Sequence, residues 1–473
     1  MSKRSINRFF NTAISIIFLV LSGCSKLVEV DPSVNFTNGD NLYNSDATAI
    51  AAITGVYTKM SEQIQFGISS LSILPALSAD ELTLFGGVNN AVLANYYRNA
   101  LTNSNDDYWN SFYPVVYTLN SALEGITAAN ALTPKVKKQL LGEAHFMRAF
   151  SYFYLVNLYG DVPLALTSDY TQNGVLSRTP KEQVYKQIEI DLKEASSLLS
   201  EEFLNGTLKI STIDRLRPTK WAAIALLSRV YLYEKDWVNA QASATAIIDN
   251  SGQFDLVQQL DNVFLANSNE AIWQLQPVNN GENTPDAKLF ILPESGPQDS
   301  YPVYLSPQLL RSFQPGDLRK SHWVDSVIVT GVTYHYPYKY KVSELYQPIT
   351  EYKMVMRLAE QFLIRSEAYV QQGNAAAAVK DLNRIRNRAG LLDYVGAMDK
   401  ASLLMEVDHQ RQDELFTEWG DRWLNLKRRG TIDAVMSKVT SEKGGVWKTE
   451  WEWYPVPFFE IQSNPKIIQN TGY

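Results

Sequence analysis

The sequence predicts a mainly α-helical protein, built from helical hairpins of the tetratricopeptide type and joined to an irregular subdomain with a few short strands. Three observations support this fold class. Apolar residues recur at three- and four-residue steps in several long segments, two of these segments resemble one another, and prolines and glycines gather in residues 251–345. Of the 473 residues, 45% are hydrophobic and 12% aromatic, which is ample for a packed core.

The first helical pattern begins near Asp46, in DATAIAAITGVYTKM, and Asp46 is the expected N-cap. Residues 62–105 follow, and because they are rich in Gly, Asn and Ser we expect a loop. A second helix is predicted from about Asp106 to Ile126. Its Pro114 would lie within the first turns, where a missing N–H group is tolerated.

The middle of the chain has strong helical periodicity. Residues 135–159 place apolar side chains mostly at three- and four-residue steps and are followed by a Gly-Asp-Val-Pro sequence, which ends a helix. Residues 181–199 are predicted to form the antiparallel partner of this helix.

Two later segments, residues 217–249 and 357–390, each predict a helical hairpin. At an offset of 138 residues a Ser, a Tyr and an Ala recur, at Ser228, Tyr231 and Ala240 and again at Ser366, Tyr369 and Ala378. A Tyr late in the first helix and a small Ala early in the second are typical of tetratricopeptide hairpins, because the small residue lets the paired helices approach closely. The alternative is a pair of unrelated hairpins.

Residues 251–345 interrupt the helical pattern with prolines, glycines and short alternating runs such as WVDSVIVTG, which predict a few strands. Large irregular segments on rigid scaffolds tend to carry binding. We therefore divide the mature chain into an N-terminal helical repeat region at 46–250 with a binding loop at 62–105, an irregular ligand-binding subdomain at 251–345, and a C-terminal helical repeat and closing segment at 346–473.

The only cysteine, Cys24, follows a basic stretch and the nine-residue apolar run Ala13–Leu21. This is the pattern of a secretory signal peptide over residues 1–23, followed by a polar tether at 24–45. Cleavage before Cys24 would expose the thiol that a bacterial lipoprotein pathway acylates, and several acyl chains give durable membrane anchoring. We expect lipidation at Cys24; an ordinary signal peptide with an incidental cysteine is the alternative.

The formal net charge of −7 argues against nucleic acid as a partner, because phosphates demand a basic surface. The four histidines show no metal-ligand spacing, and there is no P-loop, dinucleotide fingerprint, nucleophile elbow or zinc helix. Acidic pairs such as Asp80-Glu81 are neighbours in sequence, which suits a glycosidase poorly. We therefore expect no catalytic residue, no metal and no cofactor.

Charged residues concentrate in two helical segments, at 365–388 and 422–429. We expect the first to join helices to one another through ion pairs. For the second we expect inter-helix ion pairs with Asp413 and Glu414.

Aromatic residues are the candidates for ligand binding. Oligosaccharides present apolar C–H faces between rings of hydroxyls, so exposed Tyr and Trp side chains flanked by Asp, Asn or Arg suit them. A run of tyrosines from 334 to 340 alternates with period two and predicts a strand with an all-tyrosine face. The predicted ligand-binding residues are Asp80, Asn89, Tyr96, Tyr97, Arg98, Phe290, Tyr301 and Tyr304. The alternative for any of these aromatics is burial in the core.

Four stretches of the chain, taken in order, resemble the SusD/RagB family of nutrient-uptake lipoproteins from Bacteroidota. They are CSKLVEVDPS from Cys24, EAHFMRAFSYFYLVNLYGDVPL at 143–164, the 359–390 segment with QRQDELFTEWGDRWLNLKRRG at 410–430, and the tail WYPVPFFEIQSNPKIIQNTGY at 453–473. The family is similarly marked by a Tyr-Gly-Asp-Val-Pro-Leu helix end and a closing Gln-Asn-x-Gly-Tyr.

The resemblance implies a tetratricopeptide scaffold with an irregular ligand-binding half, anchored to the outer membrane and facing the cell surface. It also implies a SusC-like TonB-dependent transporter as partner, over which the lipoprotein acts as a lid that captures an oligosaccharide or a peptide. Two alternatives stay open at this point. The chain could be a transporter-associated interaction protein without ligand affinity of its own, or an anchored hydrolase with an unrecognised site.

Overall fold

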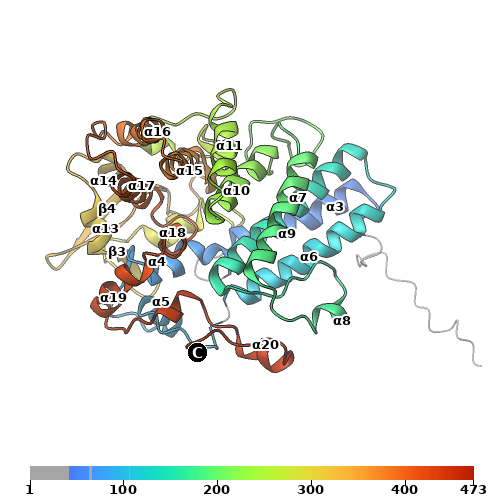
Figure 1. The fold of residues 1–473 in the computed structure, drawn as a ribbon, viewed down its shortest axis with the longest axis horizontal. Coiled ribbons are helices and arrows are strands. Elements are labelled where there is room, and N and C mark those ends of the chain that lie inside the picture. Colours follow the sequence, from blue (N-terminus) through green and yellow to red (C-terminus); the bar gives the residue numbers. More distant parts are fainter. Residues whose placement is uncertain (1–41, 63–66, 106) are drawn as a thin grey trace, which may run out of the picture.

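The computed structural model describes residues 42–62, 67–105 and 107–473 (Figure 1). The predicted signal peptide, the lipidation residue Cys24 and nearly all of the tether lie outside the described residues. Helices dominate the described part and strands are few and short, which confirms the predicted fold class. No helix in this part of the chain is both long and apolar enough to cross a membrane.

The N-terminal half is built around one long buried helix, α7. From Phe146 to Tyr159 every side chain of α7 is buried. Its neighbours on three sides are α3, α6 and α9. The bounds of the four helices are α3 Asp46–Ser61, α6 Trp109–Ala128, α7 Pro134–Tyr159 and α9 Lys181–Leu198.

Cross-helix contacts confirm that α9 runs antiparallel to α7. Tyr185, near the start of α9, bonds to Asn157 near the end of α7, and Asp191 further along α9 binds Arg148 earlier in α7. The predicted N-cap of α3 was wrong by one residue. Ser45 caps the helix by accepting from the Thr48 N–H, and Asp46 instead accepts from Thr133.

The two predicted hairpins fold in the same way. Each connecting turn holds a residue with positive φ, Lys235 at 62° and Gly373 at 80°, and each second helix is capped by the next side chain, Asp236 or Asn374. The two hairpins stack through α11 and α15. The bounds are α10 Lys220–Tyr233, α11 Trp237–Ile248, α15 Leu358–Gln371 and α16 Ala375–Arg388.

The expectation of a loop at 62–105 was wrong. The described part of this segment holds η2 Ile68–Ser72, α4 Leu74–Ser78, β1 Leu82–Leu84 and α5 Ala91–Tyr97. Every residue from 68 to 82 is buried. Because η2 and α4 lie wholly within this stretch, no alternation of apolar and polar residues reveals them in the sequence. Serines are tolerated here because their hydroxyls bond to the backbone, as Ser69 does to Met60.

Residues 251–345 form short elements, as expected, but two sheets tie them to other parts of the chain. Three two-stranded antiparallel sheets pair β1 with β3, β2 with β6, and β4 with β5. The elements are η3 Leu260–Asn262, β2 Ala271–Leu275, α12 Pro285–Phe290, β3 Val303–Leu305, α13 Pro307–Ser312, α14 Leu318–His322, β4 Val324–Val329, β5 Val332–Pro337 and β6 Lys353–Arg357.

The strand predicted in WVDSVIVTG is confirmed as β4, but the all-tyrosine strand face is only half formed. Tyr334 and Tyr336 belong to β5, which ends at Pro337. Tyr338 and Tyr340 lie beyond the strand, and the buried Tyr340 hydroxyl accepts from the Met354 N–H.

The remaining helices close the molecule. In Figure 1, α17 and α18 lie beside the α15–α16 hairpin, whereas α5, α19 and α20 lie along one edge. Their bounds are α8 Tyr170–Asn173, α17 Lys400–Leu415, α18 Asp421–Arg429, α19 Ile432–Glu442, η4 Thr449–Glu452 and α20 Phe458–Ser463.

A buried ion network joins the irregular segment to the helical scaffold. The Glu414 carboxylate, on α17, is fully buried and contacts Arg319, Arg357 and Arg388. Burial acts to raise the pKa of Glu414, but the three arginines outweigh it and hold the pKa far below its usual range. Glu414 is therefore ionised at neutral pH.

The partners expected for the 422–429 segment were wrong. Arg422 binds Asp80 and Arg428 binds Glu367, whereas Asp413 and Glu414 both contact Arg319. The expected joining of helices by the 365–388 residues is confirmed by the pairs Arg365–Asp381 and Arg388–Glu414.

Replacing Glu414 by Gln should lower the free energy of unfolding by about 3–5 kcal/mol, because it leaves buried arginine charge uncompensated. Chemical denaturation measures this loss. Glu189→Gln is the matched control: the half-buried Glu189 pairs with Lys193, whose side chain is 58% exposed, and i,i+4 helix pairs of this kind contribute only about 0.3–0.5 kcal/mol. Equal stability of the two variants would contradict the assigned role of the network.

Candidate functional site

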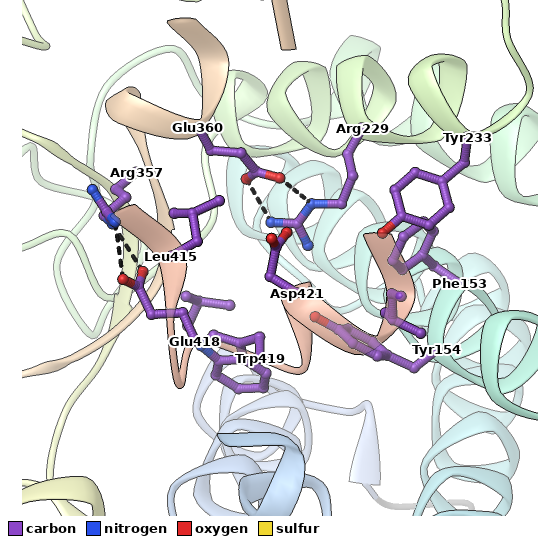
Figure 2. A pocket seen from close by; sticks show the side chains of 12 residues that line it. Phe153, Tyr154, Arg229, Tyr233, Arg357, Glu360, Leu415, Glu418, Trp419 and Asp421 are labelled. Carbon is purple, nitrogen blue, oxygen red and sulfur yellow. Dashed lines mark hydrogen bonds and ion pairs between the residues drawn. The ribbon is translucent and has the colours of Figure 1, made fainter. Parts of the chain in front are cut away.

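A small cavity lies between α7, α10, α15 and α18 (Figure 2), and its lining is closed by ion pairs. Arg229 binds Glu360, Arg357 binds Glu418, and the third carboxylate, Asp421, is bound by Arg411. The volume is about 20 Å³, roughly enough for one water molecule. The cavity is thus part of the structural core and has no room for a nutrient.

A larger cleft, of about 580 Å³, lies between the start of α9 and the C-terminal tail. One of its charged residues, Arg178, is fully engaged with the protein. Arg178 donates to the backbone carbonyls of Asp161, Tyr159 and Ile468, and the Trp453 ring lies 3.7 Å from the Lys427 ammonium. The Arg178 guanidinium is therefore committed to holding the tail in place.

The pairing of β1 with β3 brings together the two segments in which binding residues were predicted. Leu82 and Leu84 of β1 lie opposite Leu305 and Val303 of β3, and Thr83 lies opposite Tyr304. Successive side chains of a strand point to opposite faces. Because Val303 and Leu305 are buried, Thr83 and Tyr304 face outward.

Three further aromatic rings extend this outward face. Tyr334 of β5 meets Tyr304 edge-on at 5.2 Å between ring centroids, and Phe85, just after β1, meets Tyr334 edge-on at 6.1 Å. Tyr97, the last residue of α5, lies close to Thr83, whose side chain acts to lower the pKa of Tyr97. We call Phe85, Tyr97, Tyr304 and Tyr334 the aromatic face; all four residues are half-buried.

The electrostatics at Tyr97 agree with this arrangement. Burial, and next the neighbouring Tyr304 hydroxyl, raise the pKa of Tyr97 above its ordinary value. Both phenols are therefore neutral at physiological pH. A neutral hydroxyl donates and accepts hydrogen bonds, as the hydroxyls of a sugar do.

Polar residues border the aromatic face. Asn89 is exposed, and its backbone N–H donates to the Asp299 carboxylate at 3.4 Å. Arg98 is exposed directly after Tyr97. Tyr301 is half-buried and lies just before β3. The pairing of β1 with β3 extends by one hydrogen bond beyond the strands, which the Phe85 N–H donates to the Pro302 carbonyl. Of the predicted binding residues, Tyr97 and Tyr304 belong to the aromatic face, whereas Asn89, Arg98 and Tyr301 are at least partly open to solvent and lie near its members in the chain.

Three other predicted binding residues are buried, so their predicted exposure was wrong. Tyr96 is 1% exposed and packs edge-on against Tyr454, and Phe290 is 3% exposed. Asp80 is 5% exposed, and Arg422 binds both of its carboxylate oxygens at 2.7 Å. Burial acts to raise the pKa of Asp80, but Arg422 outweighs it and the pKa is lowered.

One local signal could have separated Tyr96 from Tyr97. Leu93 and Tyr96 are three residues apart and form the buried side of α5, whereas Tyr97 points elsewhere. The signal is visible only once a helix is expected at 91–97. Phe85 and Tyr334 lie outside the predicted set, because only the long-range packing of β1, β3 and β5 makes them neighbours.

The histidines and acids of the described residues give no sign of metal binding. No group of three or more His, Cys, Asp or Glu in this part of the chain is arranged to hold a metal ion. His145 contacts Asp191, His322 contacts Asp261, and His409 contacts Asp413.

Comparison with known protein families identifies the family of this chain. Residues 38–232 match the family described as "Starch-binding associating with outer membrane", and residues 329–473 match the SusD family. The chain belongs to the SusD family. SusD proteins are binding proteins, and the first of these family descriptions associates its members with the outer membrane.

Individual relatives are distant in sequence but align over most of the chain. SusD-like protein P2 of Formosa agariphila is 26% identical over an alignment that covers 97% of this chain and 98% of the relative. A laminarin-binding SusD-like protein has a similar fold, with a TM-score of 0.72 and 23% identity over 90% of this chain and 99% of that one. Surface glycan-binding protein A from Bacteroides fluxus gives a TM-score of 0.75 and 21% identity over the same shares.

Asp80→Ala should lower the free energy of unfolding by about 3–5 kcal/mol, because the buried Arg422 guanidinium would lose its carboxylate. Asn89→Ala, at an exposed position on the same surface, should change it by less than about 0.5 kcal/mol. Chemical denaturation of the two variants beside the wild type measures both effects. An Asp80→Ala variant of unchanged stability would show that the ion pair does not hold this segment.

Proposed function

We propose that this chain is a lipid-anchored protein of the bacterial cell surface that binds an oligosaccharide on the aromatic face and delivers it to a SusC-like TonB-dependent transporter. The observation that carries the proposal is the gathering of four half-open aromatic rings from two distant segments, beside exposed Asn and Arg side chains. The laminarin-binding and glycan-binding proteins of similar fold support a carbohydrate as the ligand class.

The chemistry of the face suits a sugar. Aromatic rings pack against the apolar C–H side of a pyranose, and a few placed polar groups orient its hydroxyls. Here Tyr97 and Tyr304 supply rings that also carry hydroxyls, and Asn89 and Arg98 supply an amide and a guanidinium. These groups recognise a ligand by contact, which fits capture and transfer rather than hydrolysis.

The anchor and the partner complete the proposal. Cys24 lies outside the described residues, and its assignment rests on the signal-peptide pattern that precedes it. A lipid-anchored protein beside a transporter keeps captured ligand at a high effective concentration for the second binding step. The delivery step therefore needs the anchor as well as the aromatic face.

Tyr304→Ala and Tyr97→Ala should each weaken glycan binding by about 1–2 kcal/mol, the effect expected when a stacked aromatic ring is lost. The measurement is isothermal titration calorimetry, with laminarihexaose as the first probe and a glycan array to find the preferred ligand. Tyr170→Ala is the matched control, because Tyr170 is 80% exposed on α8, away from the face.

Unchanged affinity of both face variants for a glycan that the wild type binds would refute the placement of the site. Failure of the wild type to bind any glycan or peptide, together with stable co-purification with the transporter, would favour an interaction protein without a ligand. Release of reducing ends from a bound glycan would favour a hydrolase.

Cys24→Ala should move the protein from the outer-membrane fraction to the soluble fraction and abolish incorporation of labelled palmitate, because acylation supplies the proposed anchor. Membrane fractionation and palmitate labelling measure this in the native host. A variant that still fractionates with the outer membrane and still takes up label would contradict lipidation at this residue.

A further inference from the structure

One lysine of the C-terminal segment, Lys443, contacts both α4 and a ring of the aromatic face. Lys443 follows α19, and its ammonium donates to the backbone carbonyls of Leu77 at 2.6 Å and Ser78 at 3.3 Å, and also to that of Ala79. These carbonyls belong to the last turn of α4 and the residue after it. Carbonyls at a helix C-terminus have no partner within the helix, and a cation there is favourable.

The same ammonium lies 5.1 Å from the centroid of the Tyr97 ring. This distance is within the range of a cation–π interaction. Lys443 thus connects the end of α4 with the ring that ends α5. Tyr97 also lies close to Thr83 of β1, because α5 packs against that strand.

Two neighbours of Lys443 hold the turn that follows Tyr97. The Thr440 hydroxyl accepts from the Asn99 amide at 2.9 Å, and the same amide donates to the Ser78 carbonyl at 3.1 Å. Asn99 has φ of +51°, an uncommon value for a residue other than glycine. At Gly445 a Cβ atom would lie 2.3 Å from the Arg98 carbonyl oxygen, so the backbone approach there requires glycine.

The helix that carries Tyr97 is too short to fix its own position. α5 has seven residues, and isolated helices shorter than roughly 12–15 residues are marginal in water. The orientation of its last side chain therefore depends on contacts from outside the helix. Besides its packing on α4 and β1, this end of the helix is contacted by residues 440–445, more than 300 positions later in the chain.

We propose that Lys443 is a positioning residue for ligand binding: with Thr440 and Gly445 it holds the α5 C-terminal turn so that the Tyr97 ring is presented in the aromatic face. The inference rests on the proposed function, because it assigns Lys443 a role at the proposed glycan site. It goes beyond that function by placing a determinant of affinity in a segment that does not itself lie on the face.

A double-mutant cycle tests the proposal, with laminarihexaose or the best array glycan as probe. Lys443→Met keeps the length of the side chain and removes its charge and donors. It should weaken binding about tenfold, as Tyr97→Ala does, and the double variant should bind no more weakly than Tyr97→Ala alone. Lys443→Arg, which keeps the charge and donors, should retain most of the affinity.

Lys427→Met is the matched control, because the Lys427 ammonium also lies on an aromatic ring, that of Trp453, which is not one of the four rings of the aromatic face. It should leave glycan affinity unchanged. If Lys443→Met also leaves affinity unchanged at a temperature where it is folded, or if its effect adds fully to that of Tyr97→Ala, the positioning role is overturned.

Crystal structures of the variants separate this inference from the proposed function. The Tyr97 ring should leave its wild-type position in Lys443→Met whether or not a glycan binds, and an unmoved ring would refute the inference. Should Lys443→Met fail to fold, Thr440→Val removes only the hydroxyl bonded to Asn99 and should displace the 97–99 turn. A glycan affinity insensitive to Tyr97→Ala would instead refute the site itself.

Discussion

The buried charge of Glu414 is the constraint on which the arrangement of the whole molecule depends. A carboxylate with no exposure to water is costly unless cations and hydrogen bonds surround it. The three arginines that meet it come from different parts of the chain: Arg319 from the irregular segment, Arg357 from β6 and Arg388 from the second repeat hairpin. None of these segments can satisfy the charge alone. The carboxylate is therefore stable only when the irregular segment is docked on the helical scaffold.

That docking creates the aromatic face. The irregular segment carries Tyr304 and Tyr334, and the stretch before α6 carries Phe85 and Tyr97. They meet through the three-residue pair of β1 with β3, which is too short to be stable by itself. The pair gains its stability from the buried side chains of Leu82, Val303 and Leu305, and from the Asp80–Arg422 ion pair just before β1. The face is thus a product of tertiary assembly rather than of any one segment.

The same dependence explains what the sequence could and could not predict. The stacked hairpins were predictable because their apolar periodicity is local and their turns carry Lys235-Asp236 and Gly373-Asn374 at matching places. The elements between 68 and 82 were not, since a segment buried on all sides has no periodicity to detect. Asp80 was assigned to the ligand because its true partner, Arg422, lies 342 positions away. A single sequence does not show that two residues so far apart in the chain are in contact.

Adjacent residues can differ in role, one packing in the core and the next lying on the aromatic face. Tyr96 is a core residue and Tyr97 belongs to the face, because one step along a helix turns the side chain by about 100°. In β3 the alternation is sharper still: Val303 and Leu305 pack inward while Tyr304 faces outward. The inward side chains therefore stabilise the fold by packing, whereas the outward side chains are the ones that a ligand could contact. Under the proposed function, exchange of outward residues would change the ligand while the inward residues keep the scaffold, because a fold and the site built on it can vary separately.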